Sequence, residues 1–297
     1  MLALSASDLA TGKEHTPEGS QLISTALGHR VKAISALSCA ISVGLDRFEQ
    51  ANAMLATCFA LLFQSTLLDD GLIEYMTFFR GTIALSIQMG CRRMKFLFQN
   101  LFGDQGFKQI DGAISSTPLI KPEVVAAACR SFERFSHLCR SKVETEVYTI
   151  LYGIAQSLRA SSRDGKSSLI LVSRFCHFLT CNVAYLNLSE MYRLFGYSMP
   201  PDQFHEFVNP QNEVCKLLQA HFVALQLIMT PITIKEKEGR KSPTEDNDGV
   251  TARWLIALHS NIAPPMVTYY EWTMWIEQEV NQGRIYNSEY PEEIISI

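Results

Sequence analysis

The amino-acid sequence predicts an all-α protein, built as a single multi-helix domain. Apolar residues recur three and four positions apart through most of the 297 residues, the spacing that gathers them on one face of a helix. No convincing run alternates apolar and polar residues, as a half-buried strand would. Hydrophobic residues make up 47% of the chain and charged residues 19%, which indicates a well-filled interior, an apolar cavity or a buried partner surface.

Composition sets the expected boundaries of this domain. Residues 1–20 are polar and contain two glycines and a proline, so we expect a flexible lead-in. The all-helical domain spans residues 21–283, and residues 284–297 form a tail. Inside it, the charged run KEKEGRKSPTEDNDG at 235–249 has little to bury and predicts a mobile surface loop.

Ten helical segments are expected, at residues 21–43, 48–66, 72–89, 91–101, 122–139, 142–158, 168–195, 213–229, 250–261 and 265–281. The first carries an apolar stripe and stops at Gly44. The second is apolar nearly all round, which indicates a central helix packed on every side. Asp69 and Asp70 precede the third, where an aspartate carboxylate can accept from unpaired backbone amides. The fourth is a short amphipathic piece before a loop at 103–121.

Prolines and polar loops bound the later segments. Pro122 falls in the first turn of the fifth segment, where the missing N–H costs nothing. The polar loop 161–165 ends the sixth segment, and Pro200 and Pro201 stop the long, apolar seventh. The eighth segment is strongly apolar, and the last two close the helical domain.

Charge and cysteine spacing argue against several classes of function. The formal net charge of −4 argues against direct nucleic-acid binding by this chain, since a free-standing binder would carry a basic face. The eight cysteines include no CxxC pair, so no zinc-cluster spacing can be drawn. The pair Cys176 and Cys181, with His177, offers too few ligands for a metal site. We predict no catalytic residue, no metal and no cofactor.

The sequence predicts no membrane span. The most apolar stretch, residues 51–68, is interrupted by polar residues and falls short of the roughly 20 apolar residues that cross a bilayer. The first thirty residues contain no signal peptide. The protein is therefore expected inside the cell, in the cytoplasm or the nucleus, with reduced thiols.

About seventy residues near the N-terminus carry a family resemblance. They read HRVKAISALSCAIS at 29–42, FEQANAMLATCFALLFQSTLLDDGLIEYMTFFRGTIALSIQMG at 48–90 and RRMKFLF at 92–98. A second, weaker stretch is RWLIALHSNIAPPMVTYYEWTMWIEQEV at 253–280. Together they resemble the C-terminal regulatory domain of fungal sterol-uptake-control transcription factors.

The resemblance implies an all-helical domain that senses a sterol in an apolar pocket and forms a homodimer. It also implies control of sterol synthesis and uptake. The zinc-cluster pattern of six cysteines is absent from this sequence, so DNA binding is not implied for this chain. Diverged relatives accompany fungal secondary-metabolite pathways, so the expected ligand is a sterol or a related terpenoid.

Apolar side chains at helical spacing are the candidates for such a pocket. Flexible methionines and aromatic rings adapt to shaped apolar ligands, although plain core packing is the alternative for each of them. The aromatic cluster of the last helix could instead form a partner surface. The candidate ligand-binding residues are Met54, Phe59, Phe63, Met76, Phe79, Ile83, Phe222, Tyr269 and Trp272.

Two further functions stay open at this point. Asp69, Asp70 and Glu74 superficially resemble the aspartate-rich metal box of helical terpene cyclases, although a helix cap is the simpler interpretation. An enzyme that reuses the apolar pocket to cyclise or rearrange a terpenoid or polyketide is therefore the main alternative. The third possibility is a decoy subunit that pairs with a full-length regulator.

Overall fold

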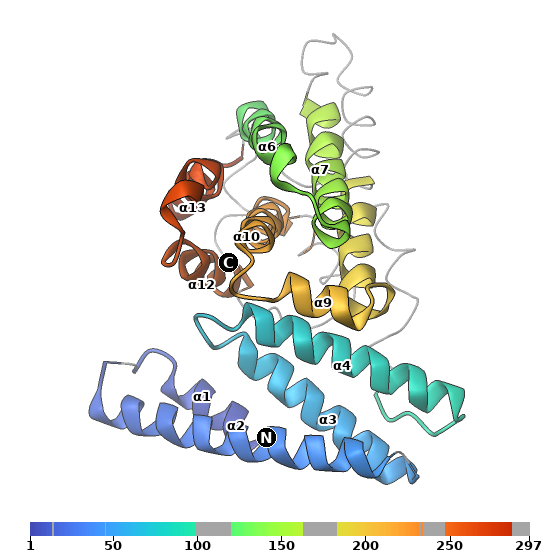
Figure 1. Ribbon diagram of the computed structural model, residues 1–297. Helices are drawn as coiled ribbons and strands as arrows, with labels where there is room; N and C mark the ends of the chain where they lie inside the picture. Colours follow the sequence, from blue (N-terminus) through green and yellow to red (C-terminus); the bar gives the residue numbers. More distant parts are fainter. Residues whose placement is uncertain are drawn as a thin grey trace. The chain divides into compact units, whose positions relative to one another are not determined.

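The computed structural model describes residues 1–98 except 14 and 45, then 120–162, 183–231, 233 and 247–286 (Figure 1). Within these ranges the chain is all-α and contains no strand, which confirms the predicted class. An isolated antiparallel bridge joins Ile120 to Tyr286. In the same part of the chain, no helix is long and apolar enough to cross a membrane.

The chain divides into two compact units. The first comprises Met1–Gly103 with Leu194–Met199, and the second comprises Asp104–Arg193 with Pro200–Ile297. The prediction of one continuous domain over 21–283 stays a prediction. The helices of the first unit are α1 (Leu2–Ala10), α2 (Pro17–Val43), α3 (Phe48–Ser65), α4 (Leu72–Cys91) and the π-helical turn η3 (Leu194–Ser198).

The N-terminal twenty residues differ from the expected flexible lead-in, because they hold α1 and the first turn of α2. Ala3, Ala6 and Ala10 lie on the buried side of α1, and their small side chains let it lie close against its neighbours. Thr16 caps α2, since its hydroxyl oxygen accepts from the backbone N–H of Gly19 at 3.0 Å.

Helix α2 ends where the sequence predicts, at Gly44. This residue has a φ of +102°, a conformation that a residue with a Cβ rarely adopts. The expected short helix at 91–101 is wrong over the described residues 92–98, which are not helical. The Asn52 side chain of α3 holds this segment instead, with its Nδ2 donating to the Lys95 carbonyl at 2.8 Å and its Oδ1 accepting from the Leu97 N–H at 3.0 Å.

Helix α3 packs against α2 and α4 but is not covered on every side, contrary to the sequence prediction. Met54, Leu55, Cys58 and Leu61 are buried in a shared core with α2 and α4. Ala53 and Ala56 are exposed along the edge of α3 that borders α2. The edge stays open because α2 presents small side chains there, which do not fill the space.

A buried cation ties together the four main helices of the first unit. Arg30 of α2 is only 3% exposed, and its guanidinium donates to the Oε1 of Gln64 at 2.9 Å and the Oγ of Ser65 at 3.1 Å. It also forms an ion pair with Glu74 of α4. The Nε2 of Gln64 donates onward to the carbonyl of Ala3, at 3.3 Å, in α1. These bonds therefore connect α1, α2, α3 and α4.

The turn η3 attaches to α4 within the same unit. Arg80 of α4 donates to the carbonyl oxygen of Phe195 at 3.0 Å and to that of Met199 at 2.6 Å. Gly196 allows close approach, since a Cβ at this position would lie 2.6 Å from the Cδ1 of Ile83.

The second unit is organised around α10 (Glu213–Ile228), in which twelve of sixteen residues are buried. In Figure 1, α10 runs through the middle of this unit. A further helical segment covers residues 183–193. The other elements are α6 (Pro122–Phe135), η2 (Ser136–Leu138), α7 (Lys142–Ser162), α9 (Pro201–Phe207), α12 (Asn247–His259), η4 (Pro264–Tyr269) and α13 (Glu271–Asn281).

Several expectations fall outside the described residues. Residues 235–246 of the expected loop lie outside the described residues. The last three residues of that loop, 247–249, begin α12. Cys176, His177 and Cys181 also fall outside, as does the tail after residue 286.

Candidate apolar binding groove

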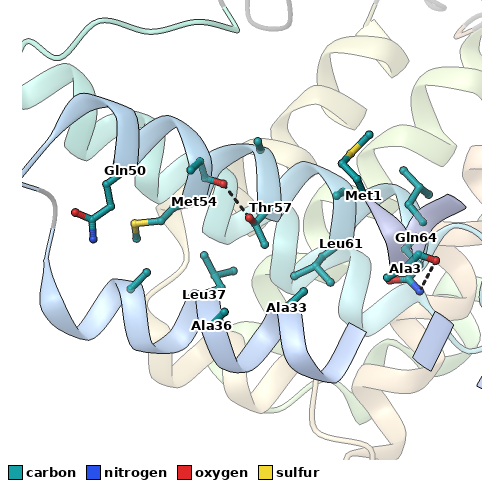
Figure 2. A pocket seen from close by; sticks show the side chains of 15 residues that line it. Met1, Ala3, Ala33, Ala36, Leu37, Gln50, Met54, Thr57, Leu61 and Gln64 are labelled. Atoms are coloured by element: carbon teal, nitrogen blue, oxygen red, sulfur yellow. Dashed lines mark hydrogen bonds between the residues drawn. The ribbon is translucent and has the colours of Figure 1, made fainter. Parts of the chain in front are cut away.

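An apolar groove of about 370 Å³ lies between α2 and α3, with α1 at one end (Figure 2). Its walls are mainly alanine: Ala33, Ala36 and Ala40 from α2 and Ala53, Ala56 and Ala60 from α3. Leu37, Met54 and Leu61 are buried and line its deeper part. The groove falls within the size range of small-molecule sites, near its lower end.

Helical periodicity explains why the groove is continuous. The lining alanines of α2 follow one another at three- and four-residue steps, as do those of α3, so each set forms one stripe along its helix. Because an alanine side chain ends at Cβ, two facing alanine stripes leave space that larger side chains would fill. The groove extends along α3 from Gln50 to Gln64, a rise of about 21 Å.

Three neutral polar side chains interrupt the apolar lining. Gln50 lies toward one end and Gln64 at the other, beside α1, with Thr57 between them (Figure 2). The Thr57 hydroxyl donates to the Ala53 carbonyl at 2.8 Å, which leaves its oxygen able to accept. Among the described residues that line the groove, none has a charged side chain. The groove therefore suits an apolar, uncharged molecule.

Of the predicted ligand-binding residues in the first unit, only Met54 lines the groove. Phe59 packs against the core, its ring centroid 5.4 Å from that of Phe98. Phe63 is 46% exposed and stacks on Phe59. Phe79 and Ile83 face Gly196 of η3.

The remaining predicted residues lie elsewhere. Met76 is buried within α4. In the second unit, the Phe222 ring meets that of Tyr192, and the Tyr269 ring meets that of His137. Trp272 packs against the buried ring of His221. Within each unit, therefore, the candidates contact different neighbours, and the prediction that they line a single pocket stays a prediction.

The alanines that build the groove were missed by sequence reasoning. A signal was present, because alanine recurs at 33, 36 and 40 and again at 53, 56 and 60. Alanine is also the residue with the highest helix propensity, so such spacing is read first as helix formation. Only the pairing of α2 with α3 shows that the two stripes face each other.

The acidic residues of the enzyme hypothesis do not converge. Asp69 and Asp70 are exposed in the turn before α4, and Glu74 pairs with Arg30. Over the described ranges, no three His, Cys, Asp or Glu side chains are placed to hold a metal ion. Burial raises the pKa of the Cys58 thiol, near the groove, to about 11, so this thiol is protonated and weakly nucleophilic at neutral pH.

A hydroxyl, imidazole and carboxylate do line up in the second unit. The Nδ1 of His259 is 2.7 Å from the Oε2 of Glu277, and its Nε2 is 2.9 Å from the Oγ1 of Thr273. Thr273 is completely buried, and its hydroxyl donates to the Tyr270 carbonyl at 2.9 Å. This hydroxyl is therefore closed to substrate, and the three residues join α12 to α13.

Comparison with protein-family models, with curated proteins and with solved structures gives no significant match to this chain. The resemblance to sterol-uptake-control regulators accordingly stays a hypothesis that rests on the stretches at 29–98 and 253–280.

Proposed function

We propose that this protein is a ligand-sensing regulatory module that binds an apolar small molecule in the groove between α2 and α3. The single observation that carries the proposal is the groove itself, about 370 Å³ in volume, with mainly apolar lining. The sequence resemblance adds the expected ligand class, a sterol or related terpenoid, and the expected role in a fungal transcription regulator.

The groove also lies where ligand binding could change the arrangement of helices. Its walls come from three helices, and Leu61 and Gln64 both line it and accept hydrogen bonds from Arg30, at 3.4 and 2.9 Å. Arg30 in turn pairs with Glu74 of α4. A ligand that binds one arrangement of these helices better than another shifts the population toward it.

The homodimer expected from the resemblance has a suitable surface on α2. Leu27, Val31, Ile34 and Ile41 are exposed and recur at steps of four, three and seven residues, so they form one apolar stripe. Such a stripe on a helix can pair with its equivalent in a second copy. Homodimer formation through this stripe is part of the proposal.

The enzyme alternative has less support. The carboxylates that would hold a metal are separated, with Glu74 engaged by Arg30. The described side chains that line the groove include amides and a hydroxyl but no acidic or basic group. Recovery of a bound terpenoid as a new product would nevertheless replace the sensor proposal with the enzyme.

Thermal unfolding with a panel of sterols and terpenoids tests the proposal. A ligand that binds only the folded protein raises Tm by mass action. The variant Ala36→Leu/Ala56→Leu places larger side chains on both exposed rims of the groove and should abolish the shift. Ala84→Leu, at an exposed position of α4 outside the groove, is the matched control and should preserve it. Equal shifts in both variants would place the ligand elsewhere.

A further inference from the structure

We infer that Gln64 is the specificity-determining residue of the groove, and that α1 is a latch which a ligand oxygen displaces from it. This inference rests on the proposed function and deepens it. It requires an apolar ligand with one neutral oxygen at its end, such as an alcohol or a ketone.

The orientation of the Gln64 amide is fixed by its surroundings. Gln64 is fully buried, and its Oε1 accepts from the Nη1 of Arg30 at 2.9 Å. Because the guanidinium can only donate, the amide must direct its Nε2 the other way. That nitrogen has two hydrogens, and both are used by α1: one by the Ala3 carbonyl at 3.3 Å and one by the Oγ of Ser7 at 3.0 Å. Figure 2 shows the first of these bonds at the end of the groove.

Gln64 can therefore offer a ligand only a hydrogen-bond donor, and only in place of α1. An alcohol, aldehyde or ketone oxygen accepts such a bond. The nearby Arg30 offers a carboxylate little, because its guanidinium is already paired with Glu74. A pure hydrocarbon fills the groove but cannot replace the bonds that α1 makes, and a buried amide without partners is costly.

Helix α1 packs along α2, but its own sequence does little to stabilise it as a helix. It has nine residues, and isolated helices this short are marginal in water. It has no side-chain N-cap, no acidic residue in its first turn and no basic residue in its last. Three alanines form its buried side, whereas Leu2 and Leu9 are exposed. Each of these alanines buries only a small apolar side chain.

The consequence is a coupling between ligand chemistry and the position of α1. Met1, which precedes α1, and Ala3 and Leu4 within it contribute to the groove lining. A ligand whose single oxygen reaches Gln64 accepts one amide N–H in place of α1, and so removes one of the two bonds that hold this helix to Gln64. A ligand without that oxygen leaves α1 docked.

Titration calorimetry of the full chain, with two pairs of ligands delivered from cyclodextrin, tests the inference. The pairs are cholesterol with cholestane, and farnesol with its parent hydrocarbon. The oxygen-bearing member of the pair that binds should bind more tightly. Ser7→Ala removes one competitor for the Gln64 amide, so it should tighten binding of that member about 2- to 10-fold, the range for one net hydrogen bond. Ser5→Ala, at an exposed position of the same helix, should change nothing.

Hydrogen exchange provides the second readout. The backbone amides of α1 should exchange faster when cholesterol or farnesol is bound. Their exchange rates should not change when the hydrocarbons are bound. Gln64→Met should bind the two members of a pair with equal affinity. If this variant does not fold, the affinity of Ser7→Ala for the oxygen-bearing member still tests the inference. Equal affinity of both members for the unaltered chain, with no effect of Ser7→Ala, overturns the inference but leaves the apolar groove as the binding site. Failure of every ligand to bind overturns the proposed function as well.

Discussion

Acidification should destabilise the second unit through His221, a histidine that is buried without charge. The ring is fully buried in α10, and its centroid lies 4.7 Å from that of Phe135 and 4.9 Å from that of Phe132. The Nδ1 lies 2.9 Å from the Leu217 carbonyl, which can only accept, so the proton is on Nδ1. The Nε2 then accepts from the Ser131 hydroxyl at 2.9 Å. Burial lowers the pKa of His221 from 6.5 to about 3.

The sign follows from comparing the folded and unfolded chains. Above pH 6.5 the histidine is neutral in both, and it contributes no pH dependence. As the pH falls from 6.5 toward 3, the unfolded chain binds the proton and the folded chain does not, so the free energy of unfolding falls. Each pH unit costs about 1.4 kcal/mol, so at pH 5 the loss from this one group is about 2 kcal/mol.

Urea unfolding at pH 7 and pH 5 measures this loss. The variant His221→Gln lacks the titrating group, so its stability should change by about 2 kcal/mol less than that of the unaltered protein over the same interval. His15→Gln, at an exposed position, is the control and should keep the full pH dependence. An NMR titration in which the His221 ring protonates near pH 6.5 would refute the reasoning, as would equal pH dependence in all three proteins.

Five substitutions in the first unit, two matched pairs and Gly44→Ala, test its packing, each by urea unfolding. Met54→Ala should cost about 2–5 kcal/mol because it opens a cavity in the core, whereas Phe63→Ala, half-exposed, should cost about 1 kcal/mol or less. Arg30→Leu should lower the free energy of unfolding by about 3 kcal/mol, because it leaves buried hydrogen-bonding partners unpaired. Glu74→Gln changes the more exposed member of that pair and should lower it by about 1 kcal/mol. Gly44→Ala should cost about 1 kcal/mol, since alanine is strained at a φ of +102°. Equal costs within either pair, or a neutral Gly44→Ala, would contradict these assignments.

Local signals in the sequence were sufficient for the class of fold and for several helix boundaries. Gly44 ends α2 and Pro122 begins α6, since both act through the backbone of their own segment. The segment at 91–101 was mistaken for a helix because Asn52, more than forty residues earlier, holds residues 95 and 97. A local pattern carries no information about such a contact.

The candidate groove was predictable only in part. The sequence predicts large apolar residues as the lining, and Met54 does line the groove, but alanine is its commonest residue. This groove forms because the facing sides of two helices carry few large side chains. Predicting it therefore requires knowing which sides face each other. The same limit applies to α1. Its sequence alone does not show that Ala3, Ala6 and Ala10 form a buried side, because that side is defined by packing against α2 and α3.

The buried guanidinium of Arg30 also limits how the first unit can change during evolution. A slip of α2 by one turn would move Arg30 by about 5.4 Å, well beyond the reach of its bonds to Gln64 and Ser65. The charge would then be buried without partners, at a cost of several kcal/mol. Arg30 therefore favours one alignment of α2 with α3. The same alignment sets the width of the groove between the two helices. Sequences that lose Arg30 should show accompanying changes at Gln64 and Glu74, because the buried Gln64 and the half-exposed Glu74 both bond to its guanidinium.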